Sequence, residues 1–111
     1  MSVIHWPSII KYTGEDELGF VGSQEEWSAD ADLHAFAYEP EDILIDSDGA
    51  MFRFDYENDH VHLQPKLQAM DLGEVVELIR RHASQLGSCC IAKIAFPTVQ
   101  LAVLAVSEMQ D

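Results

Sequence analysis

The residues best suited to metal chemistry lie between positions 46 and 62. Asp46, Asp48 and Gly49 are similar to half of a calcium-binding loop, in which acidic side chains at alternate positions supply oxygen ligands. If Asp55 were the closing acid, the loop would start at Leu44, which has no ligand atom. An Asp at the end of the loop is also shorter than the bidentate Glu that such loops use. The pattern therefore favours a tight Asp-Gly hairpin turn over a calcium site.

His60 and His62 form the second candidate metal site. They are two positions apart, so both would face the same side of a strand, and three acidic residues precede them. Imidazole and carboxylate groups bind divalent transition metals, but a dedicated site needs a third and a fourth fixed ligand. The sequence shows no matching second cluster, although His34 could approach from elsewhere. We therefore predict no metal or other cofactor, with His60 and His62 as the candidate ligands if a metal binds.

Motifs for nucleophilic or phosphate chemistry are missing from the sequence. There is no Gly-x-Ser-x-Gly motif and no Gly-rich phosphate-binding loop. Cys89 and Cys90 are adjacent, so they cannot close a loop with an ordinary disulfide, and we expect them to be reduced and packed as small apolar residues. Carboxylates are so numerous that no pair stands out as an acid and base. The sequence therefore favours a protein that is not an enzyme.

The charge of the chain is strongly negative and unevenly distributed. Its 111 residues include 20 Asp and Glu against 6 Lys and Arg, a formal net charge of -14, and 15 of the acids lie in residues 1–59 with only two bases. This charge excludes unaided binding to DNA, RNA or an anionic membrane, because such surfaces are bound through Lys and Arg. The acids either form a solvated surface or receive a basic partner protein. The candidate partner-binding residues are Glu15, Asp16, Glu17, Glu25, Glu26, Asp30, Asp32, Glu41 and Asp42.

The elements that must position these residues indicate one α+β domain over residues 1–111. We expect an antiparallel sheet of two hairpins and a further strand, comprising residues 3–12 with 17–21, residues 43–46 with 51–56, and a buried strand at 89–96. In the second hairpin Phe52, Phe54 and Tyr56 fall on one face of the strand. The polar segment 58–70 contains Pro65 and is predicted to be a connection, with at most a short strand around residues 61–63.

Three segments have helical signals. Ser23 and Glu26 are spaced as a capping box, which predicts a short helix that carries Trp27 inward and ends near Leu33. Residues 71–86 show the clearest helical periodicity, with apolar residues at Leu72, Val75, Val76, Ile79, Ala83 and Leu86. Its basic residues Arg80, Arg81 and His82 suit the negative end of the helix dipole. We expect this helix to cover the apolar face of the sheet together with the C-terminal segment 98–109, whose Ala and Leu content favours a helix over a strand.

The most apolar stretch predicts a buried core segment. Residues 94–107 carry no charged side chain, but they are too few for the roughly 20 residues that a membrane span needs. The first residues lack the basic and apolar regions of a secretory signal. We therefore expect a cytoplasmic protein with no membrane association.

The chain resembles a small family of uncharacterised proteins from marine and enteric gamma-proteobacteria. The likeness runs over most of the sequence and rests on Trp6-Pro7, Ile9-Ile10-Lys11, Asp16-Glu17-Leu18, Trp27, Asp42, Leu44-Ile45-Asp46-Ser47 and Gly49. It implies a bacterial cytoplasmic domain with no assigned activity, so it transfers no catalytic residue.

The favoured functional hypothesis is an accessory or regulatory protein-interaction module whose acidic N-terminal half docks a basic protein surface. The first alternative is a small-molecule-binding or enzymatic domain with a pocket between the aromatic face of residues 51–56 and the helix at 71–86. The second alternative is a mimic of the DNA phosphate backbone, which would need its acids on one elongated face.

Overall fold

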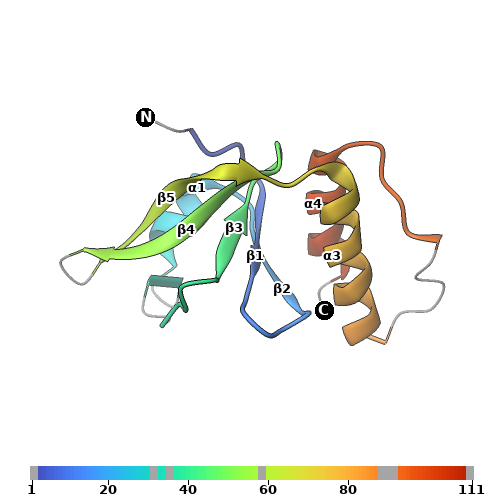
Figure 1. Ribbon diagram of the computed structural model, residues 1–111, viewed down its shortest axis with the longest axis horizontal. Coiled ribbons are helices and arrows are strands. Elements are labelled where there is room, and N and C mark those ends of the chain that lie inside the picture. Colours follow the sequence, from blue (N-terminus) through green and yellow to red (C-terminus); the bar gives the residue numbers. More distant parts are fainter. Residues whose placement is uncertain (1–2, 31–32, 35–36, 58–59, 88–92, 110–111) are drawn as a thin grey trace.

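The sheet is antiparallel throughout, and its connections match the two predicted hairpins. The computed structural model describes residues 3–30, 33–34, 37–57, 60–87 and 93–109. Its described strands form a five-stranded sheet in the order β2-β1-β3-β4-β5 (Figure 1). The strands are β1 (Ser8–Lys11), β2 (Leu18–Val21), β3 (Ile43–Ile45), β4 (Ala50–Glu57) and β5 (His60–Ala69). The predicted α+β class and the pairings β1 with β2 and β3 with β4 are confirmed.

The helices begin where side chains satisfy their first free amides. In α1 (Gln24–Ala29) the Ser23 hydroxyl accepts from the Glu26 amide, while the Glu26 carboxylate accepts from the Gly22 amide. α3 (Leu72–Gln85) opens with a complete capping box between Asp71 and Glu74. α4 (Val99–Met109) confirms the C-terminal helix. None of the helices in the described part of the chain has the length and apolar character needed to cross a membrane.

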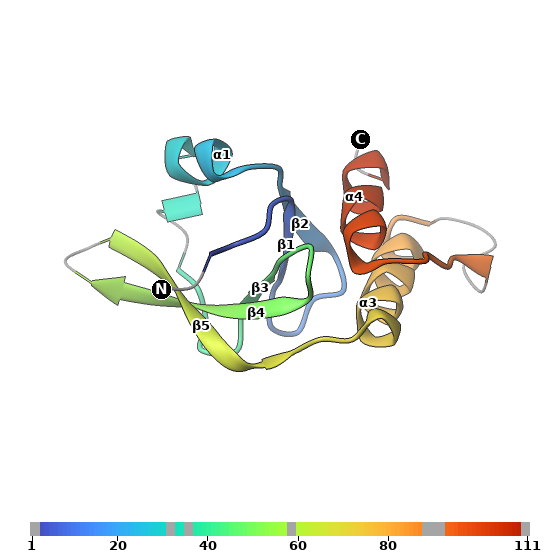
Figure 2. The same cartoon turned by 90° about the horizontal axis from the view of Figure 1, so that it is seen from above.

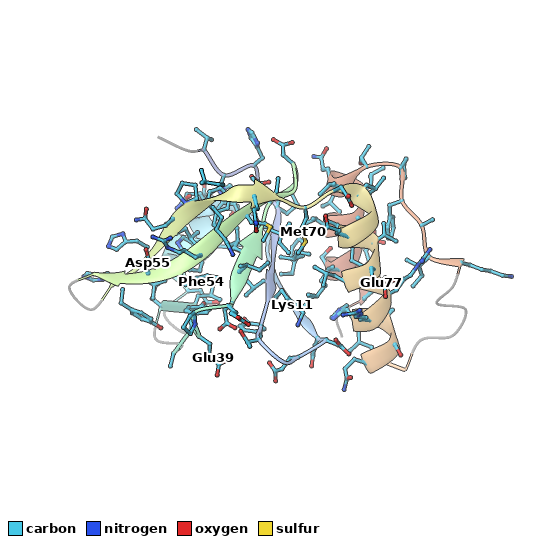
Figure 3. The ribbon with its side chains drawn as sticks, viewed as in Figure 1. Lys11, Glu39, Phe54, Asp55, Met70 and Glu77 are labelled. Atoms are coloured by element: carbon cyan, nitrogen blue, oxygen red, sulfur yellow. The ribbon has the colours of Figure 1, made fainter. Side chains whose placement is uncertain are left out.

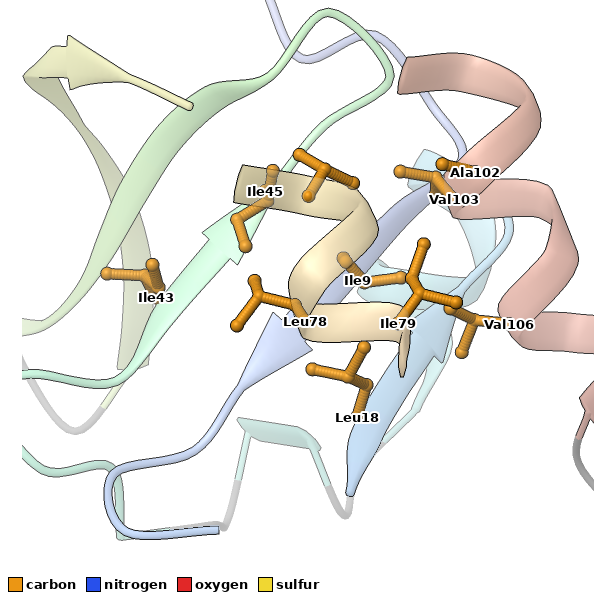
Figure 4. Packing of buried hydrophobic residues seen from close by; sticks show 10 residues of the cluster. Ile9, Leu18, Ile43, Ile45, Leu78, Ile79, Ala102, Val103 and Val106 are labelled. Atoms are coloured by element: carbon orange, nitrogen blue, oxygen red, sulfur yellow. The ribbon is translucent and has the colours of Figure 1, made fainter. Parts of the chain in front are cut away.

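One face of the sheet is covered by α3 and α4, which lie side by side (Figures 1 and 2). Alternation along the strands turns Ile9, Ile43 and Ile45 toward these helices. They pack with Ile79 of α3 and Val106 of α4, and all five side chains are buried (Figure 4). The prediction that the 71–86 helix and the C-terminal segment cover an apolar face of the sheet is confirmed.

A second core lies on the opposite face of the sheet. Leu44, Phe52 and Phe54 pack there against Trp27 of α1, and not against α3. The Phe54 ring stacks on Tyr38 with centroids 3.8 Å apart and lies 5.9 Å from the Trp27 ring. The predicted pocket between the 51–56 arm and the 71–86 helix is therefore wrong. The reason is strand alternation, because Phe52 and Phe54 project from the face of the sheet that α3 does not cover.

The fifth strand of the sheet is β5. The strand predicted at residues 89–96 is not observed in the part of that segment that the structure describes. Residues 93–96 are not extended into the sheet, and Lys93 and Ala95 are exposed; residues 89–92, including both cysteines, lie outside the described part. The prediction of a connection over residues 58–70 is wrong for residues 60–69, which form β5 and include Pro65. Pro65 is tolerated because β5 is an edge strand and its register with β4 shifts beside Pro65, between the pairs Phe52–Pro65 and Ala50–Ala69.

The turn between β3 and β4 is organised by the buried carboxylate of Asp46. Its Oδ1 atom accepts from the amides of Asp48 and Ala50, both at 2.9 Å, and its Oδ2 atom accepts from the His5 amide at 3.1 Å. Gly49 has φ 84°, and a Cβ atom at this position would lie 2.3 Å from the Met70 carbonyl oxygen. This is the predicted Asp-Gly hairpin turn, and its amides occupy the Asp46 oxygens that a calcium loop would need as ligands.

Candidate functional site

The acids of two separate segments lie together at one end of the sheet. The β1–β2 turn carries Glu15, Asp16 and Glu17, and the loop before β3 carries Glu39 and Glu41; all five side chains are exposed. Glu15 and Glu39 line one hollow of about 270 Å³ beside Tyr12. Figure 3 shows Glu39 on the lower side of the molecule, and the β1–β2 turn lies on the same side in Figure 1. We refer to Glu15, Asp16, Glu17, Glu39 and Glu41 as the acidic edge.

Asp42 holds the two segments of the acidic edge together. Its carboxylate accepts from the Thr13 amide at 2.6 Å, from the Thr13 hydroxyl at 2.7 Å and from the Glu39 amide at 2.8 Å. Thr13 and Asp42 are 29 residues apart in the sequence. Asp42 is itself buried, so this predicted partner-binding residue positions the edge and does not present its carboxylate to solvent.

The hydrogen bonds of Asp42 determine its ionisation. Burial alone would raise its pKa, but the bonds from Thr13 and Glu39 and the charge of Lys11 outweigh burial, and the pKa is lowered from 3.8. The ionised carboxylate therefore stabilises the fold when the pH is above the pKa that Asp42 has in the unfolded chain. This stabilisation is lost as the pH falls through the lower pKa of the folded chain.

Removing the Asp42 charge is expected to abolish this acid dependence. At pH 7 the Asp42→Asn variant should melt at a lower temperature than the wild type, because the amide group cannot accept all three bonds. As the pH falls below about 4 the difference between the two midpoints should shrink, since the wild-type carboxyl then gains a proton, first in the unfolded chain and at lower pH in the folded one. Thermal melts followed by circular dichroism across this range measure the difference. A gap that stays constant from pH 7 to pH 3 would contradict the assigned role.

Two tyrosines beside the acidic edge, Tyr12 and Tyr38, have raised pKa values. Burial is the main cause that raises the pKa of Tyr12, and the charges of Asp42, Glu15 and Asp30 raise it further. Burial and neighbouring acids also raise the pKa of Tyr38. Lys11 is the basic residue beside these groups, and its ammonium donates to the carbonyl oxygens of Tyr12, at 2.8 Å, and of Glu15. The acids of this edge thus outnumber the nearby base.

Three other predicted partner-binding residues, Glu25, Glu26 and Asp30, are not part of the two segments that form the acidic edge. Glu25 and Glu26 are exposed on α1, on the far side of the second core, and the Glu26 carboxylate caps Gly22. Asp30 follows α1 and lies close enough to act on Tyr12 and Tyr38. Asp32 lies outside the described residues. The structure therefore brings together Glu15, Asp16, Glu17 and Glu41, and adds Glu39, which the sequence analysis did not select.

A second hollow lies at the opposite end of the sheet. It measures about 700 Å³ and is lined by residues from three distant segments, which are Ile4, His5, Trp6, Ser47, Asp48, Thr98, Val99 and Gln100. The His5 Nδ1 atom contacts the carboxylate of Asp48 and lies 4.0 Å from Asp46. Sequence reasoning missed this site because its residues are more than 40 positions apart and share no motif.

The two histidines predicted as weak metal ligands lie on the exposed edge of the β4–β5 ribbon. His62 is opposite Asp55 and His60 is opposite Glu57 in the strand register. Asp55 forms an ion pair with Arg53 at 3.1 Å. Among the described residues no group of three or more His, Cys, Asp or Glu is arranged to hold a metal ion.

The three basic side chains near the end of α3 each have a different partner. Arg81 pairs with Glu77 at 3.4 Å, as its spacing predicts, and Arg80 donates to the Ile94 carbonyl. His82 differs from the prediction, because it is fully buried and turned toward the sheet. Its Nδ1 atom accepts from the Leu18 amide at 2.8 Å, which requires a neutral ring.

The geometry defines a small α+β domain with two cores, one on each face of an antiparallel sheet, and with an acidic edge. The sequence matches a family, DUF4144, described as a protein structure with unknown function, over residues 6–106, and the chain belongs to this family. The fold is similar to that of a protein from Shewanella amazonensis solved by NMR, with a TM-score of 0.72 and 25% identity over 97% of this chain and 91% of that one. No curated protein matches the chain. The predicted resemblance to an uncharacterised family is thus confirmed.

Proposed function

We propose that this protein is a non-enzymatic accessory or regulatory module that docks a basic protein surface on its acidic edge. The observation that carries the proposal is the joining of two acid-bearing segments by Asp42, which places Glu15 and Glu39 around one hollow. The hollows beside this edge combine carboxylates with the aromatic ring of Tyr12. Carboxylates and an aromatic face are the groups that bind Lys and Arg side chains.

The charge of the edge would act mainly on the rate of association. Exposed carboxylates attract a basic surface at long range and orient it before contact, and added salt screens this attraction. The strong excess of acids over bases in residues 1–59 extends the same field around the edge. We place this activity in the cytoplasm, where the adjacent Cys89 and Cys90 would stay reduced.

Capture of a partner at two salt concentrations tests the proposal. The immobilised protein is incubated with lysate of its source organism in 0.1 M and in 1 M salt, where the Debye length is about 10 Å and about 3 Å. We expect a protein with a basic surface to be retained at low salt and lost at high salt. Capture of no specific partner at either concentration would contradict the proposal.

A second candidate function is binding of a small molecule in the hollow beside His5. Its volume of about 700 Å³ falls within the range of about 300 to 1,000 Å³ that is usual for ligand pockets. A thermal-shift screen with metabolites tests this function, with Asp48→Ala as the variant that removes the partner of His5. Hits that stabilise the wild type but not the variant would support the site, and a screen without hits would count against it. The acids are spread over the acidic edge, α1 and β4. A mimic of the DNA phosphate backbone would need them on one elongated face, so this arrangement does not favour DNA mimicry.

A further inference from the structure

The acidic edge is tied to α3 through one buried histidine. The amide of Leu18 donates to Nδ1 of His82 at 2.8 Å, and Leu18 directly follows Glu17 of the edge. His82 and Leu18 are 64 residues apart, so this bond joins the helical layer to the start of β2. Both residues are buried, and Figure 4 shows Leu18 packed among Ile79 of α3 and Val106 of α4.

The hydrogen bonding of His82 fits only the neutral ring. Because Nδ1 accepts from Leu18, the ring proton must lie on Nε2. Nε2 is buried and has no hydrogen-bond partner among the described residues. A second proton would have to bind Nδ1, where it would face the Leu18 N–H across 2.8 Å. Protonation therefore replaces an attractive contact with a repulsive one and leaves a charge in an apolar interior.

The charged groups around His82 do not compensate for this burial. Burial lowers the pKa of His82 from 6.5, and the charge of Glu17 opposes this effect without cancelling it. On α3 itself, Arg80 is bound to the Ile94 carbonyl and Arg81 to Glu77. α4 contributes apolar side chains to this core, among them Val103 and Val106.

We propose that His82 is a pH-sensitive latch that holds the β1–β2 turn on α3 and releases it when the ring is protonated in mild acid. Release would loosen Glu15, Asp16 and Glu17 and so weaken docking at the acidic edge. This regulatory role rests on the proposed function of that edge, but the latch itself does not.

The sign of the pH dependence follows from the direction of the shift. The unfolded chain takes up a proton on His82 near pH 6.5, whereas the folded chain does so only at a lower pH. The latch is therefore closed at neutral pH, and the stability of the fold falls as the pH drops from about 6.5 toward the folded-state pKa.

The latch is tested on the isolated protein by following the Leu18 amide signal by NMR and the Tm from pH 7.5 to 5.0. We expect the Leu18 signal to shift with pH and the wild-type Tm to fall by several degrees. In His82→Asn, the Oδ1 atom replaces Nδ1 as an acceptor that does not titrate, so both changes should be much smaller. His62 is an exposed histidine on β5. The control variant His62→Asn should show the same pH dependence of the Leu18 signal and of the Tm as the wild type.

These readouts separate the latch from the docking proposal. A Leu18 signal and a Tm that stay constant down to pH 5.0 would overturn the latch, as would equal pH dependence in His82→Asn. If His82→Asn does not fold, the wild-type NMR titration alone decides the question. With the partner captured on the wild type, binding should weaken from pH 7.5 to 5.0 more in the wild type than in His82→Asn. Equal weakening in both would overturn the regulatory role.

Discussion

Replacing Asp46 by alanine is expected to lower the free energy of unfolding by about 3 kcal/mol, because three backbone amides lose a buried, charged acceptor. The Asp46 carboxylate is fully buried and accepts from the amides of His5, Asp48 and Ala50. Alanine keeps none of these three bonds. For a domain of about 100 residues, this loss corresponds to a fall in Tm of roughly 15 °C.

A neighbouring acid provides the control for Asp46. Asp48 lies in the same turn but is exposed, so Asp48→Ala should change the free energy of unfolding by no more than about 0.5 kcal/mol. Urea denaturation of both variants measures the two values. Equal destabilisation by the two substitutions would show that Asp46 does not organise the turn.

Truncation of Phe54 is expected to have a still larger effect, about 4 kcal/mol, because it opens a cavity in the second core. The Phe54 ring is buried between Tyr38 and Trp27, so Phe54→Ala removes contacts to the segment before β3 and to α1. That segment leads into the loop of Glu39 and Glu41, and its loosening should also disturb the acidic edge.

The matched control for Phe54 is an apolar residue without a core position. Leu67 on β5 is fully exposed, so Leu67→Ala should cost less than about 0.5 kcal/mol. The comparison uses urea denaturation together with near-ultraviolet circular dichroism of the aromatic cluster. A cost below about 1 kcal/mol for Phe54→Ala would contradict the presence of a second core.

Elements with strong local signals could be predicted from the sequence. The apolar periodicity of residues 71–86 predicts α3, and the Asp-Gly turn predicts the β3–β4 hairpin. These signals depend on neighbours within a few residues, so they do not need the tertiary structure. The apolar segment of α4 was assigned by composition alone, and the structure confirms that assignment.

The features that the sequence does not predict depend on tertiary contacts. Strand alternation shows that Phe52 and Phe54 share a face, but not which helix covers that face. Pro65 is unfavourable inside a sheet, and the sequence does not reveal that β5 lies at an edge. His82 suits an exposed helix end by its charge, and its bond to Leu18 depends on a contact across 64 residues. The pairing of the β1–β2 turn with the loop of Glu39 has the same long-range origin.

Charge-matched variants test most directly whether the acidic edge binds the partner. Glu15→Gln, Glu17→Gln and Glu39→Gln combined neutralise three acids of the edge. Glu25→Gln, Glu77→Gln and Glu108→Gln combined neutralise three exposed acids on α1, α3 and α4 and give the same net charge. Binding of the captured partner to the wild type and to both triple variants is measured in 0.1 M salt. We predict that the edge variant loses the partner while the control variant retains it, and equal binding by the two variants would contradict the assignment of the docking site to this edge.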